Sequence, residues 1–130
     1  MIRAAVPVIV GLIVWVACAT GLDIALRFTL PGYAAAEPQL QFTLPMMIAR
    51  LALPGAVPSV CAGFATAWAG RGDRRPVIAV AVILLLMFIP AHYRLWSQFP
   101  IWYHLTFLGS LVLLTLLGAR LRFLSATTAR

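Results

Sequence analysis

Two pairs of side chains in this sequence have the types and spacing for ion or proton chemistry. Asp23 and Arg27 stand four residues apart, which places an acid and a base on one helical turn. His92 and His104 enclose the aromatic-rich segment 93–103, and an unperturbed histidine titrates near physiological pH, so it can carry a proton or bind a substrate group. The alternative for each pair is structural. Asp23 and Arg27 can simply neutralise each other where a helix ends, and His104 can be satisfied by a carbonyl or hydroxyl oxygen.

These residues predict neither a metal site nor a cofactor site. Zinc is bound by three or four Cys, His, Asp or Glu ligands, and Cys18 and Cys61 lie within apolar segments, too deep to join the histidines. The sequence also lacks a glycine-rich phosphate loop, a GxSxG elbow and a pair of histidines spaced to bind haem. We therefore expect no metal and no cofactor.

The composition indicates that lipid surrounds most of the chain. The 130 residues are 63% hydrophobic and 10% charged, whereas about 25% of residues are charged in a soluble domain. A chain of this length has too much surface to bury so many apolar residues in a core. All basic residues are arginines, and most of them flank apolar segments instead of forming one basic face. This pattern is typical of a membrane protein and does not favour nucleic-acid binding.

Four apolar segments predict the elements that position these residues. A helix needs about 20 residues to cross a bilayer, and the backbone must be paired within a helix or a closed barrel there. The segments lack the alternation of strands. We therefore predict one all-α domain, residues 1–130, with four transmembrane helices at about 4–24, 48–69, 76–94 and 101–120. The first segment resembles a secretory signal but is longer than a signal core, so we expect it to be retained.

The arginines also predict the orientation, because the cytoplasmic ends of membrane helices carry the excess of positive charge. We expect both termini in the cytoplasm of a multi-pass inner-membrane protein, with the first outer loop partly on the membrane surface. Residues 38–50 are expected either to belong to the second helix or to lie on that surface. The arginines expected inside are Arg3, Arg71, Arg74, Arg75, Arg120, Arg122 and Arg130, and those expected outside are Arg27, Arg50 and Arg94.

This orientation gathers a candidate polar site at the outer face. Its residues are Asp23, Arg27, Arg50, His92, Arg94 and His104, with Glu37 in the first loop. An arginine at a helix centre costs about 2.5 to 3.5 kcal/mol on insertion scales. Arg50 is therefore expected at the interface, with its stem reaching the headgroups, or inside the bundle, paired with Asp23 or Glu37.

Aromatic residues are expected at the membrane boundaries. Tryptophan and tyrosine concentrate at the headgroup level, so five residues are predicted to be interface anchors: Trp68, Tyr93, Trp96, Trp102 and Tyr103. The alternative is that those near segment 93–103 form an aromatic wall for a lipid or a quinone-like ligand.

Small residues at four-residue spacing predict close packing of the first two helices, because such stripes let helix backbones approach in lipid. The stripes are Ala17, Gly21 and Ala25 in the first helix and Ala62, Thr66 and Gly70 in the second. They are expected either to pack within the bundle or to form a dimer seam. Cys18 and Cys61 are expected at heights that differ by about 9 Å. A disulfide needs Cα atoms within about 7 Å, so free thiols are predicted.

No catalytic motif accompanies the candidate polar site. The leading expectation is an accessory or assembly partner of a larger membrane complex, in contact with the lipid bilayer and with a membrane-protein partner or a second copy. The alternative is a small dimeric transporter, or a protein that binds a lipid or hydrophobic ligand at the outer leaflet through Asp23, Arg27, Arg50 and His104. An enzyme would have only His92 or His104 for acid–base chemistry.

Overall fold

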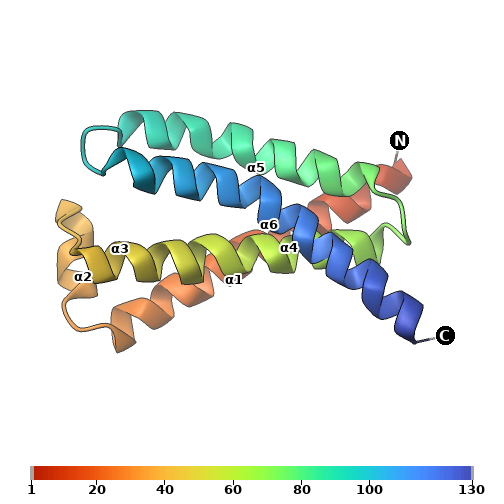
Figure 1. Ribbon diagram of the computed structural model, residues 1–130, viewed down its shortest axis with the longest axis horizontal. Coiled ribbons are helices and arrows are strands. Elements are labelled where there is room, and N and C mark those ends of the chain that lie inside the picture. The colour runs from red at the N-terminus through yellow and green to blue at the C-terminus, as the bar shows by residue number, and fades with distance from the viewer. Residues whose placement is uncertain (1, 130) are drawn as a thin grey trace.

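The computed structural model describes residues 2–129 as an all-helical bundle (Figure 1). Its long helices are α1 (Ile2–Thr29), a helix over Leu44–Ala69, α5 (Arg75–Arg94) and α6 (Ile101–Thr128), and each is long and apolar enough to cross a membrane. Two short elements, α2 (Tyr33–Ala36) and η1 (Glu37–Gln39), lie between the first two long helices. Within residues 2–129, the predicted all-α bundle with four long apolar helices is confirmed.

Three of the predicted helix ends are wrong. Helix α1 continues past residue 24 to Thr29, α6 continues past residue 120 to Thr128, and the second long helix begins at Leu44 instead of residue 48. For α1 and α6 the prediction ended the helix where the apolar segment ended, but arginine, leucine and alanine are good helix formers, so both helices extend into more polar sequence. For the second long helix the predicted start followed from the length needed to cross a bilayer, and the apolar residues before it continue the same helix.

The second long helix has three parts, which follow one another without a break. They are α3 (Leu44–Arg50), a π-helical turn η2 (Leu51–Ala56) and α4 (Val57–Ala69). Pro54 lies in the π-helical turn. A proline inside a helix removes a backbone hydrogen bond and clashes with the preceding turn, and a local widening relieves both effects. Residues 44–50 therefore belong to the helix, and Arg50 lies well inside it.

Helix α4 lies at the centre of the bundle, in contact with α1, α5 and α6. Its crossing with α6 is a close approach of backbones: a Cβ atom at Gly63 would overlap the Thr115 carbonyl, and one at Gly118 would overlap the backbone of α4. On the other side, a Cβ atom at Gly11 of α1 would overlap the Thr66 hydroxyl. Glycines at these three positions thus set how closely the helices pack.

Only one of the two predicted small-residue stripes packs inside the bundle. In α4, Ala62 and Thr66 are buried and Gly70 is half-buried, whereas Ala17, Gly21 and Ala25 of α1 are all exposed. Of the two alternatives for the α1 stripe, packing within the bundle is therefore wrong, whereas the predicted close packing of the first two long helices is confirmed for α1 and α4. Helix α1 instead turns the face with Gly11 and Trp15 toward its neighbours, and both of these residues are buried.

The two cysteines are free thiols, Cys18 in α1 and Cys61 in α4. Both side chains are half-buried, and the helices that carry them pack against each other. The prediction of free thiols is therefore confirmed.

The arrangement defines two ends of the bundle (Figure 1). Both termini and the tight connection between α4 and α5 lie at one end, which we call the termini end. Elements α2 and η1 and the connection between α5 and α6 lie at the other, which we call the loop end. Between them a core of buried apolar residues, which includes Trp15, Leu84, Phe107 and Leu111, fills the bundle. Large apolar side chains also cover much of its outside.

Candidate functional site

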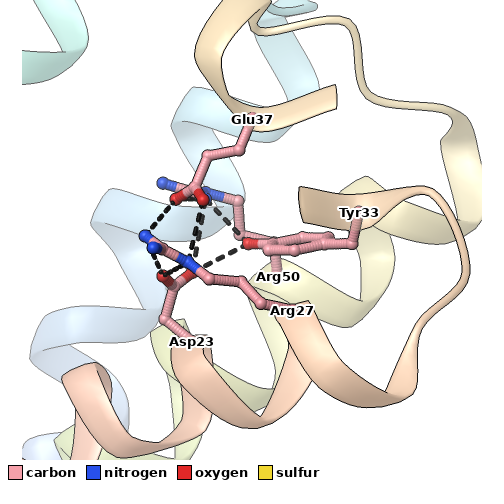
Figure 2. A network of polar contacts seen from close by, with 5 residues as sticks. All are labelled: Asp23, Arg27, Tyr33, Glu37 and Arg50. Atoms are coloured by element: carbon pink, nitrogen blue, oxygen red, sulfur yellow. Dashed lines mark hydrogen bonds and ion pairs between the residues drawn. The ribbon is translucent and has the colours of Figure 1, made fainter. Parts of the chain in front are cut away.

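Five polar side chains meet at the loop end and form what we call the Arg–acid network: Asp23, Arg27, Tyr33, Glu37 and Arg50 (Figure 2). Arg27 donates hydrogen bonds from Nε to Asp23 Oδ2 at 3.1 Å and from Nη2 to Glu37 Oε1 at 2.9 Å. Arg50 Nη1 donates to Tyr33 Oη at 2.8 Å and lies 3.6 Å from Asp23 Oδ1 and 3.8 Å from Glu37 Oε1. Two arginines are thus balanced by two carboxylates.

Tyr33 joins the two halves of the network. Its hydroxyl donates to Asp23 Oδ1 at 2.9 Å and accepts from Arg50, and its side chain is fully buried. Burial raises the pKa of Tyr33 to about 12, because the phenolate is disfavoured away from water. The phenol therefore keeps its proton at neutral pH and acts as a donor.

Tyr33 is a member of the site that was not predicted from the sequence, although a local signal for it was present. Pro31 and Gly32 directly precede it, and a Pro-Gly pair marks a turn. Gly32 has a φ of 80°, in the left-handed region. This turn reverses the chain after α1, so that Tyr33 and Glu37 come back over the last turns of that helix.

Of the two positions expected for Arg50, the structure shows the one inside the bundle. Its side chain is about one-third exposed, and its guanidinium lies over the Phe42 ring, 5.2 Å from the centroid. A cation over an aromatic face is attracted by the negative face of the ring. Arg94 is not part of the network: it is exposed in the last turn of α5, where a positive charge is favoured by the helix dipole.

The two histidines form a buried pair between α5 and α6. Nδ1 of His92 and Nδ1 of His104 are 2.7 Å apart, so one ring donates a hydrogen bond to the other. The partner of His104 is therefore a second imidazole and not the carbonyl or hydroxyl oxygen of the structural alternative. Trp96 stacks on His104, with ring centroids 4.8 Å apart. His104 Nε2 is buried without a hydrogen-bond partner.

Two cavities adjoin these groups. The larger, of about 480 Å³, has charged residues of the network and aromatic residues in its wall: Trp15, Asp23, Arg27, Arg50, Phe88 and Phe107. The smaller, of about 210 Å³, lies beneath the α5–α6 connection, and its wall includes Arg50, Phe88, His92, Tyr103 and Phe107. Arg50, Phe88 and Phe107 line both cavities. Arg50 therefore lies between the cavity beside the Arg–acid network and the cavity beside the histidine pair.

The five predicted interface anchors are not alike in the structure. Trp68, Tyr93, Trp96 and Trp102 have large exposed side-chain surfaces, whereas Tyr103 is only 4% exposed and stacks on Phe99, with ring centroids 4.6 Å apart. Tyr103 is thus part of the aromatic interior and of the wall of the smaller cavity.

The site offers no clustered metal ligands among the residues that the structure describes, since no three His, Cys, Asp or Glu side chains converge there. No protein-family model, curated protein or solved structure matches this chain. What the site can bind therefore follows from its own geometry: a mixed-charge rim next to an aromatic cavity.

Proposed function

We propose that this chain is a multi-pass inner-membrane protein with both termini in the cytoplasm, and that its loop end binds an amphipathic molecule at the outer leaflet. Four long apolar helices and the many exposed apolar side chains support the membrane location. The excess of arginines at the termini end supports the orientation.

The observation that carries the binding proposal is the larger of the two cavities that adjoin the Arg–acid network and the histidine pair. Its volume of about 480 Å³ is within the range of small-molecule sites, about 300 to 1,000 Å³. All four long helices contribute to its wall. Trp15, Phe88 and Phe107 offer an apolar surface for a hydrophobic body, while Asp23, Arg27 and Arg50 offer hydrogen-bond donors and acceptors.

The charges of the network indicate the kind of polar head. Its two arginines and two carboxylates leave no net charge, and Arg27 is already hydrogen-bonded to both carboxylates. An anionic head would have to compete with Asp23 and Glu37 for the same donors. A neutral or zwitterionic head can pair with both signs at the rim, so this is the ligand class that we propose.

The cavity can be tested with a probe that quenches tryptophan. We consider the chain with Trp15 as its only tryptophan, in maltoside micelles, titrated with dodecylphosphocholine brominated in its chain. Bromine quenches a tryptophan that it contacts, and Trp15 lines the cavity. We expect saturable quenching. Ala19 also lines the cavity, so Ala19→Phe should fill the cavity and abolish the quenching.

Ala17→Phe is the matched control, because it adds the same ring to the exposed face of α1. Its quenching curve should equal that of the parent protein. Quenching that rises linearly without saturation, or that is unchanged in Ala19→Phe, would show that the probe reaches Trp15 only from the bulk micelle.

A second candidate function is that of an accessory partner, and the exposed stripe of α1 favours it. Ala17, Gly21 and Ala25 face outward, and nothing lies within 4 Å of a Cβ atom at Gly21. Such a face lets another helix approach closely in lipid, from a partner protein or from a second copy.

For the second copy, Gly21→Leu should weaken self-association in sedimentation equilibrium by about tenfold or more, because a bulky side chain separates the two backbones. Gly109→Leu is the control, since Gly109 is equally open but lies on α6. If both variants and the parent protein associate equally, a second copy does not bind this face, and the remaining candidate is a different protein.

A further inference from the structure

The termini end contrasts in charge with the loop end. Its arginines are Arg3, Arg71, Arg74, Arg75, Arg120 and Arg122, and Asp73 is the acidic residue near them. Among residues 2–129, the ion pairs all lie in the Arg–acid network at the loop end. Asp73 instead accepts a hydrogen bond from the backbone N–H of Arg75 at 2.9 Å. The guanidinium groups at the termini end are therefore available to an external anion.

Two of these arginines border a groove between α5 and α6. The groove has a volume of about 580 Å³, and its wall includes Arg74, Ile78, Leu116, Arg120 and Phe123. The guanidinium of Arg74 lies over the Phe123 ring, 5.5 Å from the centroid, and both residues line the groove. The groove thus joins two cationic groups to an apolar track along the helices.

We infer that this groove binds one anionic phospholipid from the surrounding leaflet. A headgroup phosphodiester accepts charge-assisted hydrogen bonds from guanidinium groups, and Arg74 and Arg120 offer them from two different helices. An acyl chain can follow the exposed side chains of Ile78 and Leu116. The net positive charge of this end selects a lipid with net negative charge, and a basic pocket between membrane helices is the expected place for one.

This inference rests on the membrane location proposed above, but not on the cavity at the loop end. The two ends take different heads for one reason: Arg27 and Arg50 beside the loop-end cavity are neutralised by acids within the chain, and Arg74 and Arg120 of the groove have no such ion pair among residues 2–129. A lipid is favoured over free phosphate because the apolar track gives the acyl chain its own contact surface.

The test counts lipids retained by the full chain in native mass spectrometry from detergent micelles. Dioleoylphosphatidylglycerol should bind saturably as one lipid per chain, and dioleoylphosphatidylcholine should bind at least tenfold more weakly. The double variant Arg74→Gln/Arg120→Gln should bind phosphatidylglycerol about 30-fold more weakly. Leu116→Trp should also weaken binding, because it blocks the apolar track without changing charge.

The matched control is Arg71→Gln/Arg75→Gln, which removes the same charge from the same end but from residues that do not line the groove. It should bind almost as tightly as the parent chain. Equal weakening in the two double variants would overturn the site in favour of diffuse attraction. Displacement of the lipid by millimolar inorganic phosphate would overturn the lipid as the occupant.

Two further measurements separate this inference from the proposed function. Recovery of the chain in the carbonate-resistant membrane fraction tests the membrane location. Quenching of Trp15 in the groove variants tests the loop-end cavity. If both measurements give the expected result but the chain binds phosphatidylglycerol and phosphatidylcholine with equal affinity, the lipid site in the groove is rejected while the proposed function stands.

Discussion

At the scale of single residues, Tyr33 is the central member of the Arg–acid network. It is the only one of the five that carries no charge, and its hydroxyl links Asp23 of the first helix to Arg50 of the second. Without this hydroxyl the two ionised groups remain, but each loses a hydrogen bond in a partly buried place.

Tyr33→Phe should lower the free energy of unfolding by about 1 to 3 kcal/mol at neutral pH, because Asp23 and Arg50, both partly buried, each lose a hydrogen bond. Thermal unfolding in detergent, followed by circular dichroism, measures the difference. Tyr93→Phe is the control, since Tyr93 is 81% exposed. An equal effect of both substitutions would contradict the role of Tyr33.

The effect of Tyr33 should also depend on pH. Its pKa is raised from 10.0 in the unfolded chain to about 12 in the folded one, so the folded state retains the phenol proton more tightly. The stabilisation is complete below pH 10 and is lost as the pH rises toward 12. The difference in melting temperature between the parent chain and Tyr33→Phe should therefore be constant up to pH 10 and shrink above it. A difference that grows above pH 10 would have the wrong sign.

How much of the site is visible in the sequence depends on whether the contacts are local. The pairing of Asp23 with Arg27 follows from their spacing, because residues four apart are neighbours on any helix. The contact between His92 and His104 depends on the register of α5 against α6, which no local pattern encodes. Tyr33 and Glu37 reach the network only through the path of the loop after α1.

At the scale of helices, the lengths of the apolar segments predicted that four helices exist but not which faces pack together. In a soluble helix, an apolar stripe marks the buried face. In this chain the core-facing and outward-facing residues are both apolar, so that signal is missing. The stripes of small residues were the remaining guide. They correctly indicated burial for Ala62 and Thr66 but not for Gly21, because a small residue permits close packing without requiring it.

The α4/α6 crossing gives the sharpest prediction at this scale. Gly63→Ala should lower the free energy of unfolding by about 1 to 3 kcal/mol, because the added methyl group overlaps the Thr115 carbonyl and forces the helices apart. Gly109→Ala is the control: its Cβ atom meets nothing within 4 Å, and alanine is the better helix former. Thermal unfolding of both variants in one detergent checks the pair, and a Gly63→Ala protein as stable as Gly109→Ala would refute the close crossing.

At the scale of the whole molecule, the chain is polarised along its length. At the loop end, the charged groups of the Arg–acid network pair with one another beside a cavity. Among residues 2–129, no arginine of the termini end forms an ion pair. Because the charges of the Arg–acid network neutralise one another, they contribute little to the choice of orientation. Unpaired arginines favour the cytoplasmic side. The orientation should therefore be determined by the termini end.

Labelling from one side of the membrane tests this orientation. In a background with Cys18→Ser and Cys61→Ser, single cysteines replace Asp73, at the α4–α5 connection, or Ser97, at the α5–α6 connection; both positions are exposed. A membrane-impermeant maleimide applied to spheroplasts should label the cysteine at position 97 and leave that at 73 unlabelled until the membrane is permeabilised. Replacing Arg71, Arg74 and Arg75 with glutamine should reduce this asymmetry, because it removes much of the positive charge that retains the connection inside. Labelling of position 73 in intact spheroplasts would show that the orientation is the opposite of the one proposed. The arginine groove, with its lipid, would then lie in the outer leaflet.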